Sequence, residues 1–166
     1  MADDFHLGEL AHRQFAAHVN APVNVRGVRR AAGLALMREL SDRTRARVMA
    51  TGELMATEIG ARFLAAEGIG AVWWDARNGL RAEERASASA RANYLSATCD
   101  FGPDAALQAT LAAIAPLVIT QGFIASDAAG DTVLLGRGGS DTSGAYFAAK
   151  LQAERLEIWT DVPGMF

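Results

Sequence analysis

Apolar and polar residues follow a helical spacing through most of the first 68 positions, and short apolar runs replace it afterwards. The helical spacing predicts helices over 5–19, 28–40 and 44–66. Ser41-Asp42 is a typical start for the third helix, and Gly68 is a typical residue just past its end. We therefore expect residues 1–68 to be mostly helical.

Short apolar runs bounded by turn residues predict strands in the rest of the chain, at 71–74, 93–98, 117–120, 132–135 and 156–160. Two further helices are expected, one after Asp104 as N-cap and one from the glycines at 136–139 to about 152. Because strands alternate with helices, the pattern indicates an α/β fold with a parallel-type sheet covered by helices on its faces. We expect one domain over 1–166, with its α/β part in 69–166.

Composition narrows the function classes. The 166 residues are 51% hydrophobic and carry a net charge of −3, which argues against nucleic-acid binding because that needs clustered positive charge. No apolar run reaches the roughly 20 residues of a membrane span. No signal peptide is visible, and the single cysteine, Cys99, suits a reducing compartment as a structural residue. We expect a cytoplasmic protein that binds neither nucleic acid nor membrane.

The glycine-rich segment 135–141 (Leu-Gly-Arg-Gly-Gly-Ser-Asp) between a strand and a helix is the strongest local signal. Gly138 and Gly139 let the backbone approach a ligand, and Arg137 offers a fork for a carboxylate or phosphate. Asp141 lies in the first helical turn, where it either caps the helix or organises cationic groups. The alternative is a tight turn with no ligand. The spacing matches neither the phosphate loop nor the dinucleotide pattern.

Two other segments offer weaker candidates. Glu53 follows Gly52 inside a long helical stretch, where a break could turn its carboxylate toward a ligand amine; a solvated surface glutamate is the alternative. Thr160 and Asp161 end a predicted strand, the usual place for ligand contacts in doubly wound folds, although they also suit a simple turn.

Resident metal sites and hydrolytic triads find no support. The three histidines, His6, His12 and His18, do not share a helical face and have no cysteine or acidic partner at ligand spacing. Lys150 is the only lysine, so a mechanism that needs one has a single candidate, and we expect this side chain to reach solvent.

Five segments, taken in order, resemble the aspartate kinases of the amino-acid kinase family. They are 52–57 (Gly-Glu-Leu-Met-Ala-Thr), 74–77 (Trp-Asp-Ala-Arg), 118–124 (Val-Ile-Thr-Gln-Gly-Phe-Ile), 135–141, and 157–164 (Glu-Ile-Trp-Thr-Asp-Val-Pro-Gly). The resemblance implies part of a three-layer α-β-α amino-acid kinase fold. It also implies the family's reaction, in which the β-carboxylate of L-aspartate attacks the γ-phosphate of MgATP, the first step toward lysine, threonine and methionine.

The resemblance also implies roles for individual residues. Arg137 would hold an aspartate carboxylate and Glu53 its ammonium, in a pocket shaped by Phe123, Gly138, Gly139 and Ser140. With Arg137, Asp141 would act in catalysis by orienting the phosphate-binding groups. The nucleotide site would begin at Thr160, Asp161 and Phe166, where Phe166 replaces the family's tyrosine. ATP and Mg²⁺ are the implied cofactors, and a homo-oligomer is implied for the whole enzyme.

The family's Lys-Phe-Gly-Gly segment does not occur here, and neither do its regulatory domains. We therefore expect an internal fragment of a catalytic domain, inactive alone; Asp-Thr-Ser-Gly at 141–144 suggests a parent fused to a diaminopimelate decarboxylase. A glutamate or acetylglutamate kinase is the alternative enzyme. A non-catalytic domain that kept only the substrate pocket is the alternative from another class.

Overall fold

The computed structural model of the protein describes residues 41–159. Its elements, in order, are α3 (Asp42–Ala66), β1 (Ala71–Trp73), the short 3-10 helix η1 (Ala76–Asn78), α4 (Ala90–Leu95), α5 (Ala105–Ile114), β2 (Leu117–Ile119), β3 (Ile124–Ser126), β4 (Thr132–Leu134) and α6 (Gly139–Leu151). The helices predicted over 5–19 and 28–40 lie outside the described residues.

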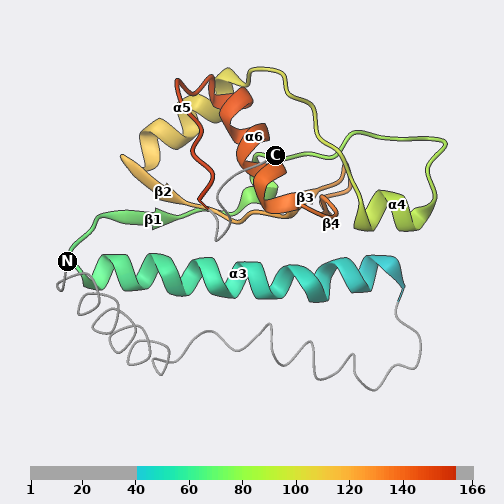
Figure 1. Cartoon of the computed structure of the whole chain (residues 1–166), viewed down its shortest axis with the longest axis horizontal. Coiled ribbons are helices and arrows are strands. Elements are labelled where there is room, and N and C mark those ends of the chain that lie inside the picture. The colour runs from blue at the N-terminus through green and yellow to red at the C-terminus, as the bar shows by residue number, and fades with distance from the viewer. Residues whose placement is uncertain (1–40, 160–166) are drawn as a thin grey trace.

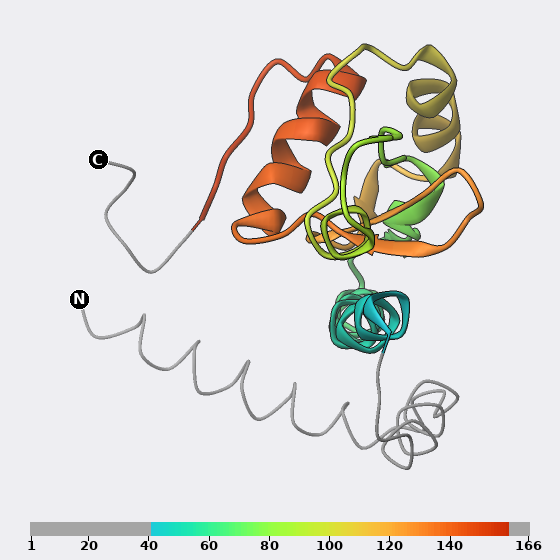
Figure 2. The same ribbon diagram turned by 90° about the vertical axis from the view of Figure 1, so that its right-hand side faces the viewer.

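The elements form three layers, with the strands between helices (Figures 1 and 2). The long helix α3 covers one side of the strands, and α5 and α6 cover the other. Strands β1 and β2 pair in parallel, with Ala71 opposite Leu117, whereas β3 and β4 form an antiparallel hairpin with Ile124 opposite Leu134. The predicted α/β class is confirmed.

Helix α3 is continuous over 25 residues. The Ser41 hydroxyl accepts a hydrogen bond from the Thr44 amide at 3.2 Å, as expected of an N-cap. Small residues, Ala46 and Ala50, are fully buried and pack against the core. The break considered at Gly52 does not occur, because tertiary packing of this face outweighs the roughly 1 kcal/mol that glycine costs relative to alanine in a helix.

The helices on the opposite side begin in two different ways. The Asp104 carboxylate caps α5 by accepting a hydrogen bond from the Leu107 amide at 2.9 Å, as predicted. Helix α6 has no side-chain cap: Gly138, with φ 71°, precedes it in the left-handed region. Asp141 is therefore not the N-cap of α6, which leaves its carboxylate exposed in the first turn.

Two predicted strands are wrong within the described residues. The Ser89 hydroxyl caps a helix by accepting from the Ala92 amide at 3.2 Å, so residues 93–95 form the end of α4, and 96–98 pair in no strand of the described structure. Residues 156–159 are extended but pair with no strand in the described part of the chain, and their apolar side chains are exposed, Trp159 by 88%. A short apolar run becomes a strand only where a neighbouring strand accepts its hydrogen bonds.

Lys150 does not reach solvent. It is 5% exposed, because it shares the inward face of α6 with Ser143 and Tyr146. Its ammonium donates to Asp100 Oδ2 at 2.8 Å. The adjacent Cys99 is buried, and burial raises the pKa of its thiol to about 11, in keeping with a structural cysteine.

None of the helices in the described range is both long enough and apolar enough to span a membrane.

Candidate functional site

The loop between β4 and α6 presents an unpaired guanidinium. Gly136 and Gly138, with φ 78° and 71°, adopt the left-handed conformation on either side of Arg137. The Gly139 amide donates back to the Gly136 carbonyl at 3.1 Å, which closes the loop. Arg137 is exposed and makes no hydrogen bond or ion pair with any residue in the described range. The loop backbone is therefore closed by an internal hydrogen bond, and within residues 41–159 the guanidinium keeps its donors available for a ligand.

Phe123 lies directly against this loop. Its amide donates to Ser143 Oγ at 2.7 Å and to the Gly139 carbonyl at 3.3 Å, and its own carbonyl accepts from the Leu135 amide at 2.9 Å. These bonds hold Phe123 at φ 70°, a left-handed conformation that disfavours residues other than glycine. Such conformations persist where the surrounding structure fixes them, commonly at functional sites.

Glycines allow the two chain segments to meet. A Cβ on Gly139 would lie 2.7 Å from Phe123 Cδ2, and one on Gly122 would lie 2.9 Å from Ser140 Cα. No larger residue fits either position without displacing its neighbour. The structure thus brings together Phe123, Gly139 and Ser140, as the prediction of a shared pocket requires.

The charges around α6 suit an anion with a cationic group nearby. No side chain in the described structure caps the first turn of α6, so backbone amides after Gly139 are available to donate to an anion, and Arg137 adds a positive charge beside them. A carboxylate or phosphate bound there would receive charge-assisted hydrogen bonds. The exposed Asp141 carboxylate, in the same turn, is placed to interact with cations that accompany such an anion.

Glu53 supplies a second unpaired charge from the opposite layer. It is half-buried in α3, and its carboxylate forms no hydrogen bond or ion pair within residues 41–159. The adjacent Leu54 packs against the cluster of Ile124 and Leu134 that also contacts Phe123. Leu54, the neighbour of Glu53 on α3, and Phe123, which lies against the Arg137 loop, therefore pack on the same apolar cluster.

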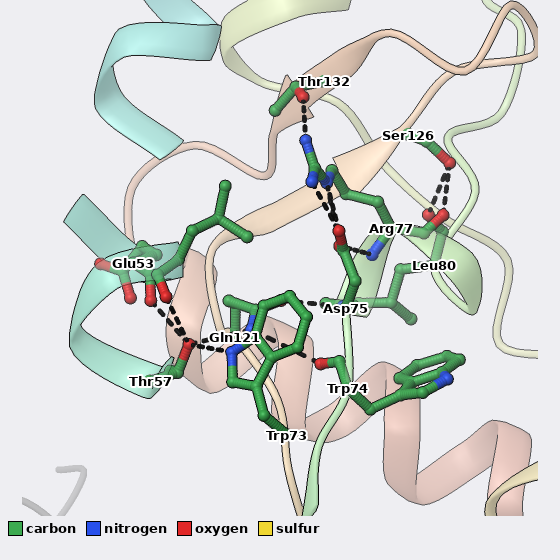
Figure 3. A network of polar contacts seen from close by, with 12 residues as sticks. Glu53, Thr57, Trp73, Trp74, Asp75, Arg77, Leu80, Gln121, Ser126 and Thr132 are labelled. Carbon is green, nitrogen blue, oxygen red and sulfur yellow. Dashed lines mark hydrogen bonds and ion pairs between the residues drawn. The ribbon is translucent and has the colours of Figure 1, made fainter. Parts of the chain in front are cut away.

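A buried polar network joins these two sides, and sequence reasoning gave it no role (Figure 3). Thr57 Oγ1 donates to the Glu53 carbonyl at 2.8 Å and accepts from Trp73 Nε1 at 3.0 Å and Gln121 Nε2 at 2.9 Å. Gln121 Oε1 in turn accepts from the Ala76 amide at 2.9 Å. The signal available in the sequence was a glutamine placed directly after the predicted strand at 117–120.

A second network is built on the ion pair of Asp75 and Arg77, which bonds to other parts of the fold. Arg77 Nε donates to Asp75 Oδ1 at 2.9 Å, and its Nη1 donates to Thr132 Oγ1 at 2.8 Å (Figure 3). Partial burial acts to raise the pKa of the Asp75 carboxyl, but the hydrogen bonds from Arg77 outweigh burial and hold that pKa below its usual range. The Arg77 carbonyl also accepts from Ser126 Oγ at 2.7 Å, so this pair joins β1 to the hairpin.

The remaining predicted residues are not tested by the fold. Thr160, Asp161 and Phe166 lie outside the described residues. A surface cavity of about 560 Å³ lies between α4 and the β3–β4 turn, where Glu83, Tyr94 and Asp127 are among its lining residues. None of the predicted site residues lines this cavity.

The sequence is similar to those of curated aspartokinases. Its sequence is 38% identical over 153 residues to lysine-sensitive aspartokinase 3 of Escherichia coli, covering 86% of this chain and 30% of that protein. It is 36% identical over 130 residues to the bifunctional aspartokinase/homoserine dehydrogenase 2 of the same organism, covering 76% of this chain and 15% of the relative. The chain thus spans less than a third of the length of these relatives.

A solved structure shares the fold. Escherichia coli aspartokinase III in complex with aspartate and ADP superimposes with a TM-score of 0.63 and 31% identity, covering 98% of this chain and 32% of that structure. Residues 8–166 also match the profile of the amino acid kinase family. Because that match spans most of the sequence and the α-β-α layers agree with it, the chain belongs to the amino acid kinase family.

Proposed function

We propose that the chain forms the substrate side of an aspartate kinase, which transfers the γ-phosphate of ATP to the β-carboxylate of L-aspartate and yields 4-phospho-L-aspartate. The observation that carries the proposal is the exposed Arg137 guanidinium, which has no partner among residues 41–159 and lies between two left-handed glycines. Glu53 adds a carboxylate on the facing layer that is likewise without a partner in this range. An amino acid with two carboxylates and one ammonium matches these charges.

In this proposal, different residues bind different groups of the substrate. Arg137 holds a carboxylate of aspartate through its planar fork, and Glu53 pairs with the ammonium. Phe123, Gly138, Gly139 and Ser140 shape the space between them. This division positions the β-carboxylate toward the first turn of α6.

The chemistry requires no general base from the protein. An aspartate carboxylate, with an ordinary pKa of ~3.9, is already ionised at neutral pH and is a competent nucleophile. Catalysis of phosphoryl transfer then consists of positioning and charge stabilisation. In this proposal the amides of α6 and Arg137 stabilise negative charge, and Asp141 orients the cationic groups that hold the phosphates.

The nucleotide and its metal complete the proposal. Thr160, Asp161 and Phe166 begin the nucleotide site for ATP. Residues 41–159 contain no cluster of three His, Cys, Asp or Glu side chains that would form a resident metal site. Mg²⁺ usually arrives with the phosphates and uses only one or two carboxylates, and the exposed Asp141 fits that need. The similarity to the aspartokinase complexed with aspartate and ADP supports both ligands.

Ligand-observed NMR of the chain with L-aspartate tests the proposal. We expect saturable binding that Glu53→Gln weakens at least 10-fold. Glu58→Gln is the matched control, because Glu58 lies on the same helix but is already paired with Arg62 at 2.6 Å. Absence of aspartate binding, or equal loss in both variants, contradicts the proposal, and preferential binding of L-glutamate favours the sibling kinases.

The cellular setting follows from the same proposal. An aspartate kinase acts in lysine and related amino-acid biosynthesis, and we propose the cytoplasm as its compartment and a homo-oligomer as the assembly of the whole enzyme. The buried single cysteine is compatible with a reducing compartment.

A further inference from the structure

We propose that Thr57 and Gln121 are positioning residues that fix the separation between Glu53 and the Arg137 loop, and that they thereby select aspartate over its longer homologue glutamate. This inference rests on the proposed function, because it assigns the substrate length that the same pocket accepts.

The Thr57 hydroxyl is fully used. A hydroxyl has one donor and two acceptor positions. Its donor goes to the Glu53 carbonyl one turn earlier, and both acceptor positions are filled from outside α3, by Trp73 at 3.0 Å and Gln121 at 2.9 Å. The turn of α3 that carries Glu53 is therefore tied to β1 and to the segment after β2.

Gln121 is the centre of this tie. It is 1% exposed, and its amide group bonds to α3 through Thr57 and to the start of η1 through the Ala76 amide. A buried primary amide with partners on both its oxygen and its nitrogen has one orientation available. Movement of α3 relative to Gln121 would leave buried polar groups without partners, which is unfavourable.

The same short segment also contacts the other side of the pocket. Gly122 lies against Ser140, and Phe123 is held by Ser143 Oγ at 2.7 Å. Residues 121–123 thus bond to α3 at one end and to α6 at the other. The turn of α3 that carries Glu53 and the start of α6 after the Arg137 loop are therefore linked through three consecutive residues.

A fixed span discriminates between substrates by length. Aspartate and glutamate carry the same charges and differ by one methylene, which a fitted pocket distinguishes by about 10- to 200-fold. Loss of the Thr57–Gln121 link frees α3 to adjust, so the pocket accepts glutamate more readily and holds aspartate less well. A residue that only stabilised the fold would weaken both ligands equally.

Thr51 provides a matched control on the same helix. Its hydroxyl makes the same kind of bond, to the Arg47 carbonyl four residues earlier at 3.0 Å, but receives none from another element in the described structure. Thr57→Val and Thr51→Val therefore remove the same kind of local bond and differ in the bonds that Thr57 accepts from Gln121 and Trp73. Thr57→Ser restores the hydroxyl, and Thr57→Ala leaves room for water if the valine variant does not fold.

The experiment measures the dissociation constants of L-aspartate and L-glutamate for the full chain and each variant by NMR titration, with thermal melting to confirm folding. We expect the dissociation constant of glutamate divided by that of aspartate to fall at least fivefold in Thr57→Val or Thr57→Ala. In Thr51→Val and Thr57→Ser this ratio should stay within twofold of its value in the unsubstituted chain. The indole N–H resonance of Trp73 should shift in Thr57→Val, because its acceptor is removed.

An unchanged ratio in a folded Thr57→Val or Thr57→Ala variant overturns this inference and leaves the proposed function standing. Failure of the unsubstituted chain to bind aspartate contradicts the proposed function, and this inference falls with it.

Discussion

Two arginines, Arg77 and Arg137, follow strands in this fold and differ in what surrounds them. Arg77 is bonded to Asp75 and Thr132, and its carbonyl accepts from Ser126. Arg137 stands exposed between two left-handed glycines and has no partner among residues 41–159. The Arg77 guanidinium donates its hydrogen bonds within the fold, whereas the donors of the Arg137 guanidinium are available to a ligand.

The contrast extends to the carboxylates. Asp75 is fixed by Arg77, and Asp100 accepts from Lys150, while Glu53 and Asp141 have no side-chain partner in the described part of the chain. Glu53 lies on α3, and Asp141 lies in the first turn of α6, directly after the Arg137 loop. Charge type alone does not identify the structural residues here; a bonded side-chain partner does.

The largest effect is expected for Arg137→Met. Removal of a fork that makes charge-assisted bonds to a carboxylate should weaken aspartate binding about 100-fold, since each such bond contributes about 1.5–3 kcal/mol. The free energy of unfolding should change by less than about 0.5 kcal/mol, because surface substitutions away from structural contacts have small effects. NMR titration and urea denaturation measure the two quantities.

Arg137→Lys sharpens this prediction. Lysine keeps the charge but not the planar fork, so binding should be intermediate between those of the unsubstituted chain and Arg137→Met. Full aspartate affinity in Arg137→Met would show that the exposed guanidinium is not a ligand group.

The reverse pattern is expected for Arg77→Met. Loss of the guanidinium leaves the partly buried Asp75 carboxylate and Thr132 hydroxyl without their partner, which should lower the free energy of unfolding by about 2 kcal/mol. This figure is below the range for fully buried pairs because Arg77 is 31% exposed. Aspartate affinity of the folded variant should change less than threefold. A larger loss of binding than of stability would erase the distinction between the two arginines.

Lys150 and Asp100 form an ion pair in which one partner is buried and the other exposed. This pair tests, with a smaller expected effect, whether a partnered charge contributes to stability. The lysine side chain is 6% exposed and the aspartate 55%. Asp100→Asn leaves a buried ammonium without its counter-charge, yet keeps the oxygen that accepts from the Gly102 amide at 2.8 Å. It should cost about 1–2 kcal/mol of stability, whereas Lys150→Met, which removes the buried charge and leaves Asp100 in water, should cost less than about 1 kcal/mol.

Urea denaturation of both variants gives the comparison directly. Equal losses, or a larger loss in Lys150→Met, would show that burial of the ammonium is not what makes this pair matter.

Local patterns were sufficient to predict the elements that depend on local chemistry. The caps at Ser41 and Asp104 and the left-handed glycine at Gly68 follow from residues adjacent to each helix end. The strand predicted at 156–160 was wrong over its described part, because pairing depends on a distant chain segment.

The site was predictable in part for the same reason. Arg137 and its glycines form one short motif, so their shared loop could be read from the sequence. The bond from Gln121 to Thr57 spans 64 positions, and the burial of Lys150 depends on how α6 packs, so neither follows from neighbouring residues. Long-range polar contacts are what the sequence alone left open.

Acid should weaken the Asp75–Arg77 pair. Arg77 lowers the pKa of Asp75 in the folded protein despite partial burial, relative to the unfolded value near ~3.9. Between the folded and the unfolded pKa of Asp75, the folded state therefore binds fewer protons than the unfolded state. The stability that Asp75 contributes is present above about pH 4 and is lost as the pH falls through its folded pKa.

Asp75→Asn and Arg77→Met should each flatten the decline in unfolding free energy below pH 4.5, measured by urea denaturation at several pH values. Part of the slope should persist in both variants, because the hydrogen bond from Lys150 also lowers the pKa of Asp100. An acid limb identical to that of the unsubstituted chain in both variants would mean that the Asp75–Arg77 pair contributes nothing to folding stability, and the contrast between a partnered and a free arginine would lose its energetic basis.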